Sequence, residues 1–308
     1  MKTFLKDGIG LVSIEKWEAK CWINIEQPTQ EDKAYLLQEI QIPEAFYNDI
    51  EDVDERPRIE IEDGWTLIIL RLPYKSADLK SPFSTIPLGL IFKGDIFVSI
   101  CFHNSEVIPD FITYTKRKRI KIKDSYYLVF RLLLSSSVWF QKYLKQINQN
   151  IKSAENQLEK SIRNEDLQTL LQLEKCLVFF TTSLKGNDIL VHRLKNTKHL
   201  KDTFDYELVE DVEIELRQAL ETTNVYSNIL SGMMDAYASV ISNNLNVIMK
   251  QLTSISLILM IPTLIASLYG MNVPNALENN KSGFWIVLLI SLGFSSFGVI
   301  IFMKRKWF

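Results

Sequence analysis

The chain has 308 residues, of which 47% are hydrophobic and 23% are charged, and its formal net charge at pH 7 is −2. This balance gives no argument for nucleic acid as a partner, and the length leaves room for one sizeable domain together with long helices. Cys21, Cys101 and Cys176 are odd in number and far apart. That pattern argues against a disulfide framework and against a zinc site, so we expect reduced, packed thiols.

Residues 1–124 combine strand and helix signals. Short runs rich in Ile, Leu and Phe, bounded by Gly, Pro or Asp, predict buried strands, and Lys93-Gly94-Asp95 between two of them predicts a tight hairpin. Thr29 and Ile42-Pro43 are plausible helix starts. We therefore expect an α+β domain, layered α/β/α, with a mainly β core. The expected strands are 66–72, 88–92 and 96–100, and the expected helices are 31–40 and 43–51.

Long helices are predicted from residue 125 onward. Only Gly186 and Gly232 interrupt the stretch before the apolar C-terminal part, and no proline occurs between Pro109 and Pro262. Apolar residues recur every three or four positions, which is typical of helices. A last helix of roughly 65 residues would be about 100 Å long, too long to be buried in one small domain, so we expect a stalk that packs against copies of itself. The expected units are a helical hairpin at 125–203, with helices near 125–162 and 165–199 and turns at Asn164 and 196–202, and a stalk at 204–251.

The C-terminal part contains two uncharged apolar runs, Leu252–Tyr269 and Phe284–Met303. Each has about the 20 residues that a helix needs to cross a bilayer. Basic residues follow the second run, so the positive-inside bias puts both termini in the cytoplasm. The first residues contain charges and no long apolar segment, so we expect no secretory signal. The expected boundaries are 252–270 for the first span, 271–283 for the external loop, 284–303 for the second span and 304–308, with Lys304, Arg305 and Lys306, for a basic tail.

A polar stripe follows one face of the last long helix at a spacing of 3.5 residues. Parallel copies of the helix would present this stripe to a common axis, as the a and d positions of a coiled coil do. Small, hydroxyl and amide side chains make a poor dry core and a good lining for a water-containing pore. On the stripe alone, dry packing of small residues between helices remains an equal alternative. The stripe consists of Asp235, Ser239, Ser242, Asn246, Met249, Thr253, Ser256, Met260, Thr263, Ser267 and Gly270.

Tyr269-Gly270-Met271-Asn272 lies at the outer end of the first span and is followed by a short loop, one more span and a basic tail. With this placement the chain resembles the CorA family of divalent-cation transporters. Further resembling segments are Trp22–Thr29, Asp54–Glu60 and Pro262–Tyr269, so the resemblance covers essentially the whole chain. It implies a homopentameric funnel in which the long helices surround the ion path.

The resemblance also implies roles for residues on that path. A ring of Asn272 side chains would accept hydrogen bonds from the waters that Mg²⁺ holds tightly, and a narrow apolar ring would close the pore by excluding water. A helix C-terminal cap before Pro274 is the alternative for Asn272. The implied selectivity filter is Gly270, Met271 and Asn272; the pore lining is Asp235, Asn246, Thr253, Ser256, Thr263 and Ser267; and the hydrophobic gate is Met249, Leu252 and Met260.

Seven acidic residues lie between Asp202 and Glu215. Acids stabilise the start of a helix through its dipole, which explains part of this density. The resemblance implies in addition that Asp211, joined by Glu215 one turn later, binds regulatory divalent ions between subunits and holds the channel closed. A merely solvated acidic face is the alternative.

We therefore expect a multi-pass protein of the cell membrane that moves Mg²⁺, with Co²⁺ and Ni²⁺ as further candidates, into the cytoplasm. Its expected partners are its own copies, the lipid bilayer and divalent cations; no nucleic acid and no organic cofactor is expected. No nucleophile–base pair or phosphate-binding loop suggests an enzyme. The basic run Lys116–Arg119 is interpreted as a solvated linker or packing surface, and His103, His192 and His199 show no ligand spacing. A zinc transporter of the ZntB-like branch and a membrane-anchored oligomeric scaffold or sensor remain as alternatives.

Overall fold

The computed structural model describes residues 2–8, 10–76, 81–160, 164–196, 205–272, 277 and 281–305. The chain divides into two compact units, Met1–Gly232 and Met233–Phe308. The boundaries expected for the hairpin and the stalk stay predictions.

A seven-stranded mixed sheet forms the centre of the first unit. Its strand order is β2-β1-β3-β7-β6-β5-β4, and all neighbours are antiparallel except β3 and β7. The expected strands and the hairpin are confirmed, because Lys93 pairs with Ile96 and Gly94 has the positive φ, +58°, that such a turn favours. The strands are β1 (Lys2–Gly8), β2 (Gly10–Ile14), β3 (Trp22–Glu26), β4 (Arg58–Glu62), β5 (Trp65–Lys75), β6 (Phe83–Lys93) and β7 (Ile96–Cys101).

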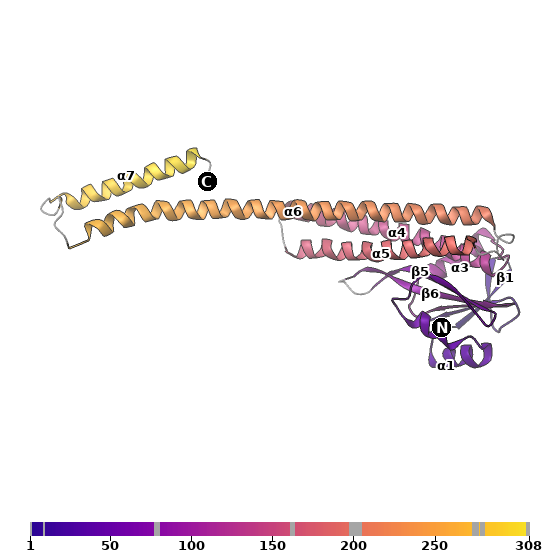
Figure 1. The fold of residues 1–308 in the computed structure, drawn as a ribbon. Helices are drawn as coiled ribbons and strands as arrows, with labels where there is room; N and C mark the ends of the chain where they lie inside the picture. Colours follow the sequence, from indigo (N-terminus) through magenta and orange to yellow (C-terminus); the bar gives the residue numbers. More distant parts are fainter. Residues whose placement is uncertain are drawn as a thin grey trace. The chain divides into compact units, whose positions relative to one another are not determined.

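Helices cover both faces of this sheet (Figure 1), which confirms the α/β/α layering. On one face lie α1 (Gln30–Ala34), η1 (Tyr35–Ile40) and α2 (Glu44–Glu51). Thr29 caps α1 in a capping box with Asp32, as the sequence suggested. The second half of the expected helix 31–40 differs, because Tyr35–Ile40 winds as a π-helix that ends at Gln41 with a positive φ of 62°. Apolar side chains of these helices and of the sheet form one buried cluster, including Leu36, Phe46, Ile50, Leu67, Val98 and Ile100.

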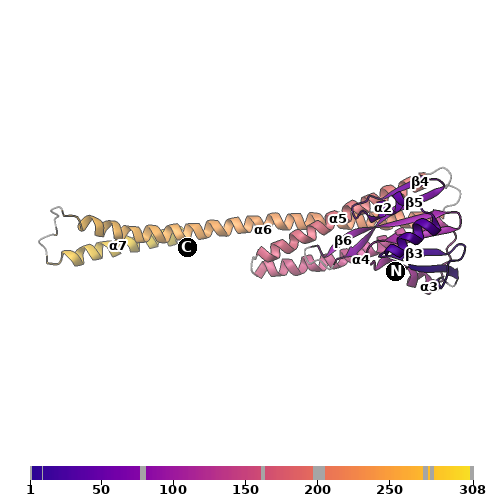
Figure 2. The ribbon, with the colours of Figure 1, turned by 90° about the horizontal axis from the view of Figure 1, so that it is seen from below.

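The opposite face of the sheet carries α3 (Val107–Lys118), α4 (Ser125–Lys160) and α5 (Asn164–Asn196), and Figure 2 shows the same elements from below. The long helices expected here are confirmed. Asn164 is the first residue of α5 rather than part of a turn, since Glu165 and Asp166 make a favourable acidic first helical turn after it. The other expected turn lies largely outside the described residues.

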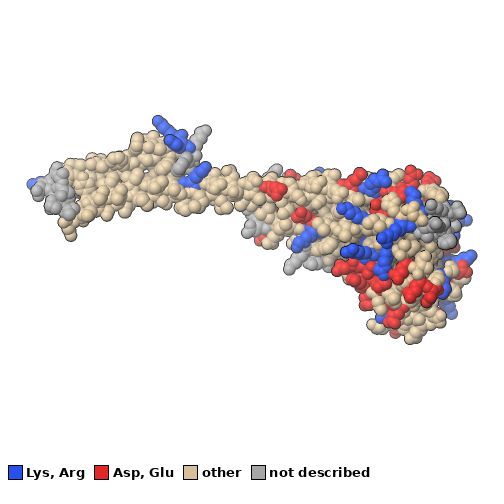
Figure 3. Space-filling model, in the orientation of Figure 1, with Lys and Arg blue, Asp and Glu red and all other residues tan. Residues whose placement is uncertain are grey.

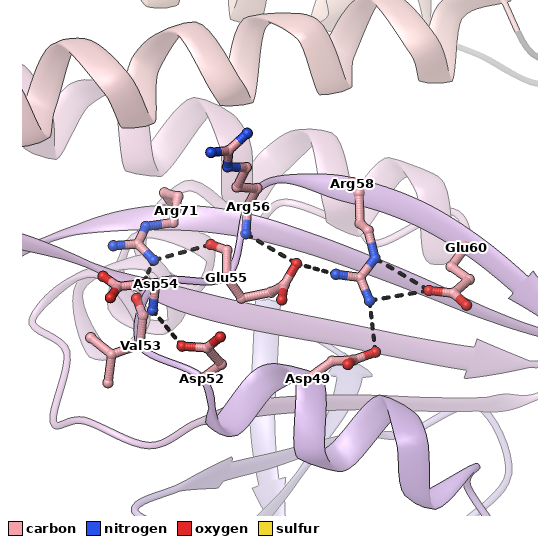
Figure 4. A network of polar contacts seen from close by, with 9 residues as sticks. All are labelled: Asp49, Asp52, Val53, Asp54, Glu55, Arg56, Arg58, Glu60 and Arg71. Atoms are coloured by element: carbon pink, nitrogen blue, oxygen red, sulfur yellow. Dashed lines mark hydrogen bonds and ion pairs between the residues drawn. The ribbon is translucent and has the colours of Figure 1, made fainter.

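The buried Arg71 connects the sheet to α5 and to the loop before β4 (Figure 4). The Arg71 side chain on β5 donates hydrogen bonds to the carbonyl oxygens of Val53, Glu55 (3.1 Å) and Thr85 (2.8 Å). The Asn187 side chain of α5 accepts from the backbone N–H of Arg71 and donates to its C=O, both at 2.9 Å. Burial lowers the pKa of Arg71, although nearby acids oppose the shift. These bonds hold α5 and the loop before β4 against the sheet.

Helix α6 (Tyr206–Tyr269) begins in the first unit and continues into the second, where α7 (Gly283–Lys304) follows. In the first unit, α6 is tied to α5 by the ion pair of Lys195 with Glu213 at 2.9 Å. The C-terminal part of α6 and all of α7 are long and apolar enough to cross a membrane. Both expected spans are therefore present as helices.

Candidate functional site

Small side chains of α7 face α6 in the second unit. Ser291 is buried, and the Ser295 hydroxyl lies 3.5 Å from the Ile258 carbonyl oxygen, to which it donates. A Cβ added to Gly298 would lie 3.8 Å from Ile258 and 3.9 Å from Ile261. Small residues at such positions allow two membrane helices to approach closely. They identify Ile258 and Ile261 as the face of α6 that α7 covers.

The polar stripe lies on another face of α6. At about 100° per residue, Ser256 and Thr263 are roughly 160° from Ile258 and Ile261, respectively. Both hydroxyl residues are exposed in the single chain, and so are Asp235, Asn246, Thr253 and Ser267. α7 therefore leaves the expected pore-lining residues uncovered.

The three residues of the expected gate are large, apolar and exposed. Met249 and Leu252 are each 58% exposed, and Met260 is 62% exposed. Met260 also borders an apolar groove of about 380 Å³ that it shares with Phe294 and Phe297 of α7. It thus lies at the edge between the stripe and the face that packs against α7.

Several hydroxyl groups of the stripe already use their hydrogen atoms. Thr253, Ser256 and Thr263 each donate to the carbonyl oxygen four residues earlier, at 2.8, 2.9 and 3.0 Å. A hydroxyl has one hydrogen, so each oxygen can only accept a further bond. Acceptors match the outward-pointing hydrogens of water molecules that surround a cation. Acceptor oxygens of this kind could receive hydrogen bonds from the water shell of a cation without carrying a formal charge.

The Gly270-Met271-Asn272 segment directly follows α6. The helix ends at Tyr269, and the Gly270 N–H still donates to the Ala266 carbonyl oxygen at 2.9 Å. Met271 and Asn272 are exposed beyond that end. The last carbonyl groups of a helix carry a partial negative charge, which attracts cations. Residues 273–276 and 278–280 of the loop lie outside the described part of the chain.

Some acids at the start of α6 form hydrogen bonds with other parts of the first unit. Asp205 accepts from Lys123 at 2.8 Å, and this bond holds the pKa of Asp205 below its ordinary value. The Glu215 carboxylate accepts from the Gln141 side chain of α4 at 2.7 Å, whereas Asp211 is exposed. Among the described residues, no three His, Cys, Asp or Glu side chains are grouped so that they could hold a metal ion. Asp211 and Glu215 alone do not complete a site within one chain.

Charge is sparse on the second unit. Its sequence has no charged residue from Gln251 to Leu277 and none from Ser282 to Met303. Figure 3 shows the visible face of this part in tan between basic groups at its two ends. Lys304 and Arg305 at the end of α7 are exposed, and Lys306 lies outside the described residues. This distribution fits two helices surrounded by lipid.

Some contacts were not expected from the sequence. Ser295 was not singled out, although Pro262 four residues after Ile258 signals a carbonyl without its usual helical donor. The Arg71–Asn187 contact was also missed. The His192 ring lies between two acids, with Nε2 3.8 Å from Oδ2 of Asp188 and Nδ1 3.9 Å from Oε1 of Glu213. His199 lies outside the described residues.

Comparison with known proteins gives one consistent family. A family model described as "CorA-like Mg2+ transporter protein" matches residues 17–305. The cobalt/magnesium transport protein CorA of Methanocaldococcus jannaschii is 29% identical over 293 residues, which cover 93% of this chain and 90% of that protein. The complete structure of the CorA magnesium transporter from the same organism matches with a TM-score of 0.86 and 25% identity, covering 100% of this chain and 99% of the other.

A more distant structural neighbour concerns the zinc alternative. The cytoplasmic domain of ZntB from Vibrio parahaemolyticus matches with a TM-score of 0.61 at 12% identity, covering 79% of this chain and 98% of that one. At this identity the likeness shows a shared fold alone.

Proposed function

Because the chain belongs to the CorA-like Mg²⁺ transporter protein family, we propose that it is a membrane transporter that admits Mg²⁺, and also Co²⁺, to the cytoplasm. The observation that carries the proposal is the exposed polar stripe of α6, which α7 leaves uncovered and which leads to Gly270-Met271-Asn272. The M. jannaschii relative is named for transport of the same two metals. Spans that merely anchor a scaffold or sensor would need only ordinary packing residues in the membrane, and the continuation of the stripe before the first span, at Asp235, Ser239, Ser242 and Asn246, favours the pore.

The proposed active form is a homopentamer in which the α6 helices surround a common axis. Asp235, Asn246 and the hydroxyl residues of the stripe would line the path. Exposed apolar residues on the other faces of α6, such as Leu259 and Leu264, would contact neighbouring copies or lipid. In this pentamer a hydrated cation on the axis would meet the hydroxyl oxygens of the stripe, which can accept hydrogen bonds from its water molecules.

Selection and closure are assigned to different levels of this path. Asn272, shaped by Gly270 and Met271, would accept hydrogen bonds from the waters of Mg²⁺ without stripping them, since this ion dehydrates reluctantly. Rings of Met249, Leu252 and Met260 would close the path by dewetting. Their exposure in the single chain is compatible with side chains that meet only when copies assemble.

Regulation by the transported ion is assigned to Asp211 and Glu215. The Glu215 carboxylate accepts a hydrogen bond from Gln141, and Glu215 follows the exposed Asp211 by one helical turn. A divalent ion shared with a neighbouring copy would offset the repulsion between carboxylates and favour a closed assembly. Mg²⁺ would then be both the cargo and the regulator.

The driving force requires no nucleotide. An inside-negative potential of 100 mV contributes ~4.6 kcal/mol for a divalent cation, from ~2.3 kcal/mol per elementary charge. Entry down this gradient needs a selective path and a gate, both of which the proposal assigns to α6 and the residues that follow it.

Ion flux into proteoliposomes tests the function. Purified protein would be reconstituted, an inside-negative potential imposed, and Mg²⁺, Co²⁺ and Zn²⁺ uptake measured in parallel against protein-free vesicles. We expect Mg²⁺ and Co²⁺ entry above that background. Uptake of Zn²⁺ alone would favour the zinc alternative, and assembled protein that passes none of the three ions would favour the scaffold.

A further inference from the structure

Pro262 lies inside α6, which continues as a helix to Tyr269. Proline has no backbone N–H, so the carbonyl group four residues earlier, that of Ile258, lacks its usual helical donor. In the hydrocarbon core bulk water cannot replace that donor, and a neighbouring Ser or Thr side chain is one of the groups that can satisfy the carbonyl. The sequence of α6 thus creates a requirement that a regular α-helical backbone does not meet.

Ser295 of α7 meets this requirement. Its half-buried hydroxyl donates to the Ile258 carbonyl oxygen at 3.5 Å. The hydroxyls of Thr253 and Thr263, by contrast, donate to carbonyl groups of their own helix. The Ser295 bond crosses between the two spans at the residue that proline leaves unpaired.

The packing around this contact keeps the two helices in register. Ser291, one turn before Ser295, is buried, and Gly298, about one turn after it, faces Ile258 and Ile261. Small residues on both sides of Ser295 therefore let its short side chain reach the backbone of α6. A residue much larger than serine or threonine at this level of α7 would hold the helices apart.

We propose that Ser295 is a positioning residue for the ion path. Its hydroxyl replaces the N–H that Pro262 lacks and couples α7 to α6 at the carbonyl group of Ile258. At 3.5 Å the contact is longer than the roughly 2.5–3.0 Å of an ordinary hydroxyl hydrogen bond, so a small displacement of α7 breaks it and a small approach strengthens it. A bend of α6 at Pro262 is then linked to the position of α7. This role rests on the proposed transport function, whereas the contact itself does not.

A double-mutant cycle in the full-length protein tests the pairing. Ser295→Ala, Pro262→Ala and the double variant would be reconstituted, and Mg²⁺ flux compared with the unmodified chain. We expect Ser295→Ala to change the flux on the order of three- to tenfold, from the range of interhelical hydrogen-bond energies in membranes. In the Pro262→Ala background, the restored N–H of residue 262 satisfies Ile258, and the same serine change should alter the flux less than about twofold. Equal effects in both backgrounds would overturn the pairing.

Two variants guard against a failure of Pro262→Ala to fold. Ser295→Thr keeps the hydroxyl, so its Mg²⁺ flux should stay close to that of the unmodified chain, unlike the flux of Ser295→Ala. Ser296→Ala removes a neighbouring, exposed hydroxyl of α7 and should leave the flux unchanged. If Ser295→Thr behaves like Ser295→Ala, the hydroxyl is not the group that matters and the proposal is wrong.

The thermal unfolding midpoint of the detergent-solubilised protein separates this inference from the transport function. The same non-additive pattern is expected for the midpoint, because the carbonyl is left unsatisfied in Ser295→Ala and satisfied when Pro262 is also replaced. If the midpoint shows the pattern and no variant transports Mg²⁺, the contact stands and the transport function fails. An additive midpoint contradicts the contact itself.

Discussion

Polar side chains bond differently in the two compact units. In the first unit they connect elements that are distant in sequence, as when Trp22 donates to Ser99 at 2.7 Å and Asn187 brackets the backbone of Arg71. In the second unit, Thr253 and other hydroxyls of the stripe bond within their own helix, whereas Ser295 bonds across from α7 to α6. The first unit therefore defines its tertiary structure through its own contacts, and in the second unit the bonds of the stripe fix the helix and leave that face of it open.

Apolar side chains show the same contrast. Residues such as Leu67 and Ile100 are fully buried in the first unit, whereas Phe284 is 71% and Leu289 68% exposed in the second. Apolar surface of that extent marks contact with lipid or protein. The comparison teaches that stability and transport should respond to different substitutions, and the following predictions test that separation.

The largest expected effect is the loss of selective uptake in Asn272→Ala. The substitution removes the amide acceptors proposed for hydrated Mg²⁺, while the first unit and its core are untouched. Flux in proteoliposomes would fall to that of protein-free vesicles, with the thermal midpoint and the oligomeric state unchanged. A purified variant that carries Mg²⁺ at the original rate would contradict the selectivity assignment.

Arg71→Met should produce the reverse pattern. It leaves the carbonyl groups of Val53, Glu55 and Thr85 without their donor, which should lower the free energy of unfolding by roughly 2–3 kcal/mol. Arg58→Met is the matched control, because that side chain is 27% exposed and forms ion pairs near the surface, with an expected cost below about 1 kcal/mol. Chemical unfolding followed by tryptophan fluorescence measures both. Equal costs would show that the buried network is no more important than a surface one.

Met249→Asp should raise the leak of ions several-fold while leaving the first unit stable. A carboxylate at an exposed position of α6 needs no buried partner in the single chain, and in the proposed pore it would hydrate a ring that closes by excluding water. Planar-bilayer conductance is the measurement. Ile255→Asp is a control on another face of the same helix, where a charge should impair assembly or insertion instead. Unchanged conductance in an assembled Met249→Asp protein would place the gate elsewhere.

The smallest expected effect concerns Asp211. If it helps to bind Mg²⁺ between copies, a concentration of 100 times the dissociation constant contributes ~2.7 kcal/mol per site to the closed state. Asp211→Ala should therefore need more Mg²⁺ to close, and Asp211→Lys, which supplies a fixed positive charge, should depend on Mg²⁺ less. Protease protection and flux across a Mg²⁺ titration would report both.

Glu207→Ala is the control for this position, since Glu207 is an exposed acid in the first turn of α6. Identical closing midpoints for Asp211→Ala, Glu207→Ala and the unmodified chain would reduce the acidic segment to a solvated helix start. This would sharpen the comparison, because the first unit would then take no part in gating.

The sequence predicts strands with long apolar runs better than the others. β5, β6 and β7 each contain a run rich in Ile, Leu or Phe. The buried β3 is only five residues long and was not expected, and β4 contains Arg58, Glu60 and Glu62 at the sheet edge, so its apolar signal is weak. α3 was not expected, because its last turn holds part of the basic run interpreted as a linker. That run follows ordinary helix chemistry, since cations stabilise a helix C-terminus.

In the candidate site, features of a single helix could be predicted from the sequence, and contacts between helices could not. The stripe could be predicted because it depends on the spacing of residues along one helix, which the sequence contains in full. The contact from Ser295 to Ile258 depends on which faces of two helices meet, and no spacing within either helix determines that. The partner of Asp211 on another copy is likewise a property of the assembly and stays a prediction.

The three cysteines make the native chain suitable for site-directed chemical labelling. Cys21, Cys101 and Cys176 are all free and fully buried, and burial raises the pKa of Cys101 to about 12. Maleimides and similar reagents attack the thiolate of an accessible cysteine. A cysteine placed at Thr253 or Ser267 would therefore react against a silent background in the folded protein. Its rate of modification would report directly whether water reaches that point of α6.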